Sequence, residues 1–178
     1  MKIIITGGAG FIGSQLVALA LKNGHHVTVV DALTYAGHLE NLTAVKDHEN
    51  FRFVKGDIRK RDEISRLVSE VKPDAFLNLA AESHVDRSIH GPGDFMRTNV
   101  QGTFTLLEAA RAHWQSLEGD AKNDFRFLHV STDEVYGSLT PDAPAFTETH
   151  AYEPNSPYSA SKAASDHLVR AYHHTYGL

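Results

Sequence analysis

The sequence predicts an α/β domain built on a doubly wound parallel sheet with flanking helices. Short apolar and β-branched runs alternate with amphipathic stretches at the lengths of strand–helix–strand units, which favours parallel strands. The first run, Ile3–Ile5, leads into a turn with glycines at positions 7, 8, 10 and 13. A strand, a glycine turn and a helix in that order, at the start of such an alternation, support the same architecture.

The first helix is expected to run from the glycine turn to about Asn23. Apolar residues recur at helical spacing over this stretch, and Gly24 suits the position just past a helix end. A second strand is expected at His26–Val30. A polar connector over residues 35–50 follows it, with a short helix expected near Glu40–Lys46.

The middle of the chain continues the alternation. A third strand is expected at Phe51–Val54 and an amphipathic helix at Arg59–Lys72, whose apolar side chains share one face. The segment Ala75–Ala81 is almost entirely apolar, which predicts a fourth strand buried on both faces. A long helix is expected at Asp94–Trp114, and it is apolar around most of its circumference.

The last part of the chain contains one more strand and one more helix. Gly119–Asn123 is expected to be a polar loop before a fifth strand at Phe125–Val130. Four prolines within Leu139–Pro157 predict a loop there. The final helix is expected at Tyr158–Tyr176, because a Ser-Pro pair precedes it and a glycine follows it.

Composition sets outer limits on function. The chain has 178 residues, 42% of them hydrophobic and 22% charged, and we expect one domain over residues 1–178. A net charge of −5 with no basic run gives no indication of nucleic-acid binding. The absence of cysteine excludes disulfides and thiolate metal ligands and fits the cytoplasm, where we expect the protein. No segment could span a membrane, and the histidines lack metal-ligand spacing, so no metal site is expected.

The glycine turn predicts a binding site for a dinucleotide. The N-terminus of the following helix presents unpaired N–H groups and a partial positive charge, which suit a phosphate. Gly7 would allow a sharp turn, Gly10 a close approach of a pyrophosphate, and Gly13 close packing of the helix on the strand. The spacing is G-x-x-G-x-x-G, and an ordinary tight turn is the alternative interpretation.

Asp31 suggests which dinucleotide is bound. It ends the second strand, 18 residues after Gly13, where the adenosine ribose is expected to lie. A carboxylate there can accept hydrogen bonds from both ribose hydroxyls and would repel a 2′-phosphate. No arginine occurs within Ala32–Thr34, so NAD is preferred to NADP. The alternative is an aspartate that only stabilises a turn.

The polar segment after the fourth strand is expected to contact a ligand. It contains Glu82, Ser83, His84, Asp86 and Arg87, just beyond the carboxyl end of the strand. Open α/β sheets bind their ligands at this edge. His84 is therefore expected to contact a substrate.

Tyr158 and Lys162 are candidates for acid–base catalysis. They lie four residues apart on a predicted helix and therefore share one face. A nearby ammonium lowers the pKa of a phenol, and a phenolate can act as general base in the oxidation of an alcohol. Thr132, just beyond the fifth strand, could bind the same hydroxyl. A surface tyrosine–lysine pair without function is the alternative.

Asp133 and Glu134 would add a second kind of chemistry. Oxidation of a sugar hydroxyl to a ketone makes the neighbouring C–H acidic. One carboxylate could then remove that proton while the other protonates a leaving hydroxyl, which amounts to a dehydration. A solvated acidic turn explains the pair equally well at this stage.

Five motifs resemble the extended short-chain dehydrogenase/reductase family: TGGAGFIG, GDI at 56–58, LAAESHVDRSI at 79–89, STDEVYG at 131–137 and YSASK at 158–162. The likeness covers the whole chain and is greatest to the nucleotide-sugar dehydratases, which are lyases. It implies a Rossmann-type domain, NAD as cofactor and dTDP-glucose as substrate. The implied reaction oxidises C4, eliminates water across C5 and C6, and returns the hydride to C6.

The resemblance also assigns roles to individual residues. Tyr158 would deprotonate the C4 hydroxyl, Glu134 would take the C5 proton and Asp133 would protonate the departing C6 hydroxyl. The catalytic set is completed by Thr132 and Lys162. The implied substrate contacts are Ser83, His84, Thr132, Asp133 and Glu134. The implied cofactor contacts are Gly7, Gly10, Phe11, Ile12, Gly13, Asp31, Ala32, Leu33, Thr34, Asp57, Ile58, Leu79, Ala80, Ala81, Glu82, Ser83, Thr98, Tyr158 and Lys162.

The resemblance further implies a homodimer through the helices at 94–114 and 158–176. Family members continue beyond the length of this chain, so we expect a domain truncated relative to the family, without its C-terminal substrate domain. Two alternatives remain open at this point. One is an enzyme similar to UDP-glucose 4-epimerase, with a structural role for Asp133 and Glu134. The other is a non-catalytic NAD-binding fragment or dimerisation unit.

Overall fold

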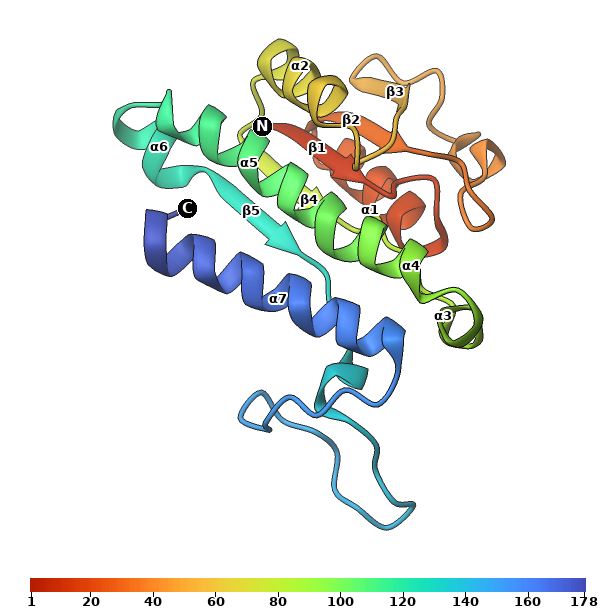
Figure 1. Cartoon of the computed structure of the whole chain (residues 1–178). Coiled ribbons are helices and arrows are strands. Elements are labelled where there is room, and N and C mark those ends of the chain that lie inside the picture. Colours follow the sequence, from red (N-terminus) through yellow and green to blue (C-terminus); the bar gives the residue numbers. More distant parts are fainter.

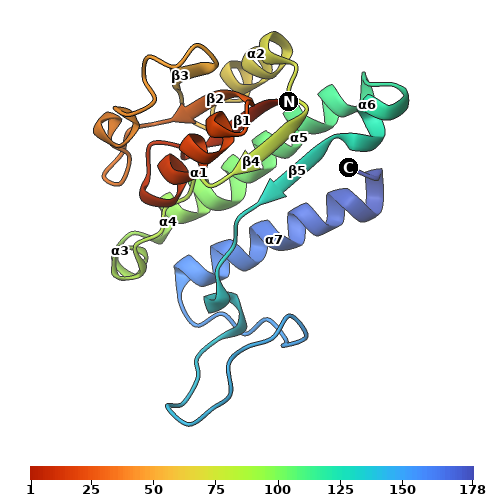
Figure 2. The same cartoon turned by 180° about the vertical axis from the view of Figure 1, so that it is seen from behind.

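The computed structural model describes all residues, 1–178, and shows a five-stranded parallel sheet with helices on both faces (Figures 1 and 2). The strand order is β3-β2-β1-β4-β5, so the chain builds outward from β1 in one direction and then in the other. This order confirms the predicted doubly wound sheet. The strands are β1 (Lys2–Thr6), β2 (His26–Asp31), β3 (Phe51–Lys55), β4 (Ala75–Asn78) and β5 (Arg126–His129).

The helices agree with the main predictions. Their bounds are α1 (Phe11–Lys22), α2 (Arg61–Val71), α3 (Val85–His90), α4 (Pro92–Phe95), α5 (Thr103–Gln115), α6 (Gly119–Asp124) and α7 (Pro157–Tyr176). A π-helical stretch, Met96–Gly102, joins α4 to α5, and short 3₁₀ turns span Leu39–Leu42 and Asp133–Tyr136. None of the helices is both long and apolar enough to cross a membrane.

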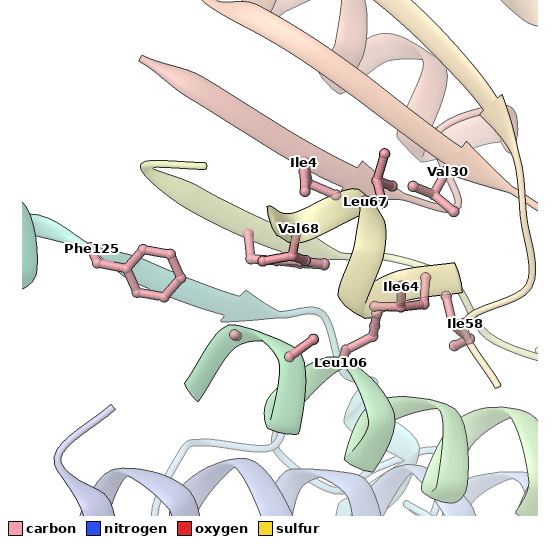
Figure 3. Close-up of a cluster of buried hydrophobic side chains, with 11 residues drawn as sticks. Ile4, Val30, Ile58, Ile64, Leu67, Val68, Leu106 and Phe125 are labelled. Carbon is pink, nitrogen blue, oxygen red and sulfur yellow. The ribbon is translucent and has the colours of Figure 1, made fainter. Parts of the chain in front are cut away.

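Two apolar cores hold the layers together, one on each face of the sheet. On one face, Ile4 and Phe76 of the strands pack with α2 and α5, where Leu67 and Leu106 are buried (Figure 3). On the other face, Ile5 of β1 packs with α1 and with neighbouring strand residues. Because β1 is covered on both faces, its run of isoleucines is explained.

Strand β4 is three residues shorter than predicted. The prediction extended it to Ala81, but pairing with β1 stops at Thr6 and Asn78. Gly7 takes a positive φ of 71° and turns β1 away, so the residues after Asn78 have no strand to pair with. Leu79 and Ala80 instead pack against the apolar cores on the two faces of the sheet.

Three short helical segments also depart from expectation. Residues 119–124 form helix α6 instead of a loop, and the polar segment after β4 contains helix α3. The connector after β2 forms a 3₁₀ turn at Leu39–Leu42 rather than a helix at residues 40–46. These segments are polar or only a turn long, so they carry no hydrophobic periodicity to predict them from.

Candidate active site

A cleft of about 370 Å³ opens at the carboxyl ends of β1 and β4, where the strand order reverses. Its walls come from the glycine turn after β1, the ends of β2 and β3, the segment after β4 and the start of α7. Ligands of open α/β sheets bind at such a reversal. This cleft is therefore the candidate active site.

The glycine turn packs against the end of β4. A Cβ on Gly7 would lie 2.7 Å from the backbone nitrogen of Ala80, and one on Gly13 would overlap the carbonyl oxygen of Gly7. The predicted reasons for glycine at both positions, a sharp turn and close helix packing, are thus observed. The first hydrogen bond of α1 runs from Ser14 N to the Gly10 carbonyl at 3.0 Å. The N–H groups of Phe11, Ile12 and Gly13 therefore precede the helical hydrogen bonds, and all three residues line the cleft.

Asp31 fixes the turn in place. The carboxylate is 8% exposed, and it accepts hydrogen bonds from the backbone N–H groups of Ala9 and Leu33, both at 2.9 Å. Gly37 packs on the same carboxylate, since a Cβ there would come within 2.5 Å of Oδ1. Asp31 therefore joins the glycine turn to the segment after β2, and it also lines the cleft.

The structure brings the predicted cofactor residues together, with one exception. Leu33 takes a positive φ of 53° and packs against the core on the α1 side instead of lining the cleft. All the others contribute to the cleft walls: Gly7, Gly10, Phe11, Ile12, Gly13, Asp31, Ala32, Thr34, Asp57, Ile58, Leu79, Ala80, Ala81, Glu82, Ser83, Thr98, Tyr158 and Lys162.

Lys162 is buried at the base of the cleft. Its side chain comes from α7 and its Nζ donates a 2.6 Å hydrogen bond to the carbonyl of Val130, at the end of β5. The residue is 4% exposed, and burial lowers the pKa of the ammonium to about 8. The Asp166 carboxylate acts in the opposite direction and raises that pKa.

Tyr158 lies one turn before Lys162 and packs edge-to-face on Phe95, with ring centroids 6.2 Å apart. Burial raises the pKa of its phenol, interaction with the Thr132 hydroxyl lowers it, and the Glu134 carboxylate raises it further. The net shift is upward, so the groups of the chain alone do not produce the lowering of the pKa that was predicted for Tyr158.

Thr132, Asp133 and Glu134 form the start of a 3₁₀ turn directly after β5. The Thr132 hydroxyl accepts a hydrogen bond from Glu134 N at 3.3 Å and lies 3.4 Å from an Asp133 carboxylate oxygen. The 3₁₀ turn contacts α7, and both carboxylates raise the pKa of the Tyr158 phenol. They do not line the cleft itself and stand beside Tyr158 at its edge.

The segment after β4 is held by residues that the sequence analysis did not single out. The Tyr35 hydroxyl lies 3.3 Å from Ser83 Oγ and accepts a 3.2 Å hydrogen bond from Ser83 N. Asn99 binds both backbone groups of Glu82, at 2.8 and 2.9 Å. His84 caps α3, is exposed and does not line the cleft, so the structure does not bring it to the other site residues.

A glycine turn at a sheet reversal, with a tyrosine and a lysine one helical turn apart in the same cleft, defines a Rossmann-type domain of the dehydrogenase/reductase class. A family model described as GDP-mannose 4,6 dehydratase matches residues 4–178. The chain therefore belongs to that family.

Individual relatives are similar over nearly the whole chain. A dTDP-glucose 4,6-dehydratase of Xanthomonas campestris is 59% identical over 175 residues, which is 98% of this chain and 50% of the relative. The structure of DesIV, a dTDP-glucose 4,6-dehydratase of Streptomyces venezuelae with NAD bound, has a TM-score of 0.88 at 49% identity and matches all of this chain and 53% of its own. A Thermus thermophilus UDP-glucose 4-epimerase in complex with NAD has a TM-score of 0.86 at 33% identity, covering 100% and 52%. The chain spans about half the length of the relatives it matches.

Proposed function

We propose that this chain binds NAD and carries the redox and acid–base side chains of a dTDP-glucose 4,6-dehydratase. The observation that carries the proposal is the gathering of Tyr158, Thr132 and the Asp133–Glu134 pair at the edge of the cleft. The similarity to dehydratases at 59% and 49% identity supports this choice over the epimerase, at 33%. The chain spans about half the length of those relatives, so conversion of dTDP-glucose is part of the proposal and is tested below.

The cleft fits a dinucleotide. No side chain covers Gly10, since a Cβ there would have only the carbonyl oxygens of Gly7 and Ala36 within 4 Å, at 3.3 and 3.9 Å. The pyrophosphate would lie over the N–H groups that begin α1. Asp31 would receive the ribose hydroxyls on its remaining lone pairs, and Asp57 with Ile58 would flank the adenine. The nicotinamide would lie between the segment after β4 and Tyr158.

The first step would be oxidation of the sugar at C4. NAD, when bound, supplies the hydride acceptor and a positive ring that favours a phenolate nearby. Tyr158 takes the proton of the C4 hydroxyl, while the Thr132 side chain holds that hydroxyl by a hydrogen bond. Lys162, fixed at the Val130 carbonyl, adds positive charge at the base of the cleft.

The second step would be loss of water. The C4 ketone acidifies the C5 hydrogen, Glu134 takes that proton, and Asp133 protonates the C6 hydroxyl as it departs. The stored hydride then returns to C6 and a proton returns to C5. The sum is one water lost from the sugar with no net change in the cofactor.

Two variants separate this function from its alternatives. The wild-type chain, Asp133→Asn and Glu134→Gln are each incubated with NAD and dTDP-glucose, and the products are analysed by mass spectrometry for loss of water and by NMR for the configuration at C4. Loss of one water in the wild type, but not in the variants, supports the dehydratase. A product of unchanged mass with inverted C4 supports an epimerase, and NAD binding without conversion supports a cofactor-binding fragment.

A homodimer through α5 and α7 belongs to the same proposal. The support is exposed apolar surface on the α4–α5 helical stretch, where Met96 is 50% and Phe104 is 45% exposed. Sedimentation equilibrium of the wild type and Phe104→Glu tests it. A mass of two chains that falls to one in the variant supports the dimer, and a monomeric wild type contradicts it.

A further inference from the structure

Asp166 is the point at which three segments of the chain meet. It lies on α7 one turn beyond Lys162, and its carboxylate accepts a short hydrogen bond from the Ser131 hydroxyl. The Tyr152 hydroxyl donates to the same carboxylate at 3.2 Å, and His129 Nε2 lies 3.4 Å from it. Asp166 therefore ties α7 to β5, to the residue before Thr132 and to the long loop that precedes α7.

The hydrogen bonds around His129 determine which ring nitrogen carries its proton. Thr6 Oγ1 donates to Asn78 Oδ1 at 2.6 Å, and this orients the Asn78 amide. The amide nitrogen of Asn78 then faces Thr103 Oγ1 at 3.3 Å and His129 Nδ1 at 3.0 Å. Because that nitrogen can only donate, His129 Nδ1 must accept, and the neutral ring carries its proton on Nε2.

The proton on Nε2 faces Ser165 and Asp166. Ser165 Oγ lies 3.1 Å from Nε2 and donates its own hydrogen to the Lys162 carbonyl at 2.8 Å, so it accepts from the ring. Lys162 Nζ, at 3.4 Å from Nε2, then faces an N–H and has no acceptor there. Its hydrogen-bond acceptor is the neutral Val130 carbonyl, and the neighbouring negative charge is that of Asp166, whose carboxylate lies 3.4 Å from the same Nε2.

The carboxylate of Asp166 keeps its negative charge in this environment. Burial would raise the pKa of Asp166, but hydrogen bonds from His129 and Ser131 outweigh it and hold the pKa below its usual value. Burial and the Lys162 ammonium lower the pKa of His129, although Asp166 opposes them. The pair therefore persists near neutral pH as a carboxylate beside a neutral imidazole.

We propose that Asp166 is a positioning residue that holds Lys162 charged and fixes α7 against the turn with Thr132, Asp133 and Glu134. The importance of Asp166 for catalysis rests on the proposed function, but its effect on the position of α7 can be tested without turnover. Without Asp166, the helix with Tyr158 and Lys162 would be joined to the end of β5 by the Lys162–Val130 and His129–Ser165 hydrogen bonds alone.

Other titratable groups near Lys162 are few. His129 faces it from β5, and Tyr158 and Asp166 share its helix. Asp133 and Glu134 of the turn, and Tyr35 from the segment after β2, act on Tyr158. Tyr152 acts on Asp166 from the long loop. Asp166 is the carboxylate whose charge raises the pKa of Lys162, so removing it has a specific expected effect.

The test is an NMR titration of the lysine side chains in the chain without cofactor or substrate. Lys162 is assigned with Lys162→Met, and its pKa is compared in wild type, Asp166→Asn and Asp166→Glu. In Asp166→Asn the pKa of Lys162 should fall by about one unit. Asp166→Glu retains the negative charge, so the pKa of Lys162 in this variant should fall by less than half as much. An unchanged pKa in Asp166→Asn, as in the control Asp47→Asn at an exposed carboxylate, overturns the proposal.

A second measurement covers the case in which Asp166→Asn does not fold. Ser131→Ala removes one hydrogen bond and leaves every charge in place. Backbone hydrogen exchange should speed up several-fold at Glu134 and Val135, which follow Ser131, and stay unchanged in β1. If Ser131→Ala does not speed up exchange at Glu134 and Val135 more than in β1, the proposal that Asp166 fixes α7 against this turn is overturned. Neither measurement requires turnover, so a failure of the dehydratase proposal would leave both interpretable.

Discussion

The Lys162 ammonium donates a 2.6 Å hydrogen bond to the carbonyl of Val130, two residues before Thr132. The bond crosses from the middle of α7 to the end of β5, and the lysine that makes it is 4% exposed. Burial of the Lys162 charge beside the cleft therefore lowers the free energy of unfolding.

Stability should therefore rise with pH above neutrality. The pKa of Lys162 is lowered to about 8 in the folded chain and is near 10.5 when unfolded, so the unfolded chain binds more protons between these values. The free energy of unfolding should increase from pH 8 to pH 10, by at most about 3 kcal/mol. Urea unfolding at several pH values measures it.

Lys162→Met is the matched control for the pH effect. It removes the titrating group, so the rise between pH 8 and pH 10 should vanish. The tyrosines do not interfere in this window. The pKa values of Tyr152, Tyr158 and Tyr172 are raised in the folded chain, so these groups change the free energy of unfolding mainly above pH 10. An equal rise in wild type and variant would show that Lys162 is not its source.

Two glycines should differ sharply when replaced by alanine. A Cβ on Gly13 overlaps the Gly7 carbonyl, whereas one on Gly24 meets nothing within 4 Å. Gly13→Ala should cost several kcal/mol or prevent folding, and Gly24→Ala, at φ 77°, about 1 kcal/mol. Denaturant midpoints measure both. Similar losses at the two sites would mean that α1 does not pack as described.

Asp31→Asn should weaken the preference for NAD over NADP. The substitution removes the charge that repels a 2′-phosphate and keeps the size of the side chain. The dissociation constant for NADP divided by that for NAD, both measured by calorimetry, should fall by about tenfold. Asp47→Asn serves as the exposed control. If the ratio changes equally in both variants, Asp31 does not determine the preference for NAD.

Gly10→Ala should separate folding from cofactor binding. The new methyl group would lie 3.3 Å from the Gly7 carbonyl oxygen, a tight contact that a small shift relieves, so the unfolding free energy should fall by only about 1 kcal/mol. The methyl would stand where the pyrophosphate approaches, and NAD binding should weaken at least about tenfold. Unchanged affinity would place the pyrophosphate elsewhere.

The fold was predictable because its signals are local. The isoleucines of β1 have the pattern of a buried strand and glycines follow them, and the sheet order confirms that β1 is the central strand. The end of β4 was not predictable, because it depends on where Gly7 turns the neighbouring strand away. Helices α3 and α6 were missed because short polar helices have no apolar periodicity.

The sequence could predict which candidate site residues lie together, but it could not predict their electrostatics. Spacing placed Tyr158 and Lys162 on one face of α7, but only the structure shows that Lys162 turns to Val130 and that the pKa of Tyr158 rises. Asp166 continues the same four-residue spacing, which is a signal that could have found it. Tyr35 and Asn99 act through backbone contacts across the fold, for which the sequence offers no pattern.

The central claim is that NAD binds in this cleft with its nicotinamide against Tyr158. The most direct measurement is an NMR titration of the chain, labelled on its tyrosine rings, with NAD, using Tyr158→Phe to assign the signal. The claim predicts that the Tyr158 ring signal shifts and saturates with NAD, and that Gly10→Ala requires much more NAD for the same shift. Saturable NAD binding that leaves the Tyr158 signal unmoved, or no binding at all, would contradict it.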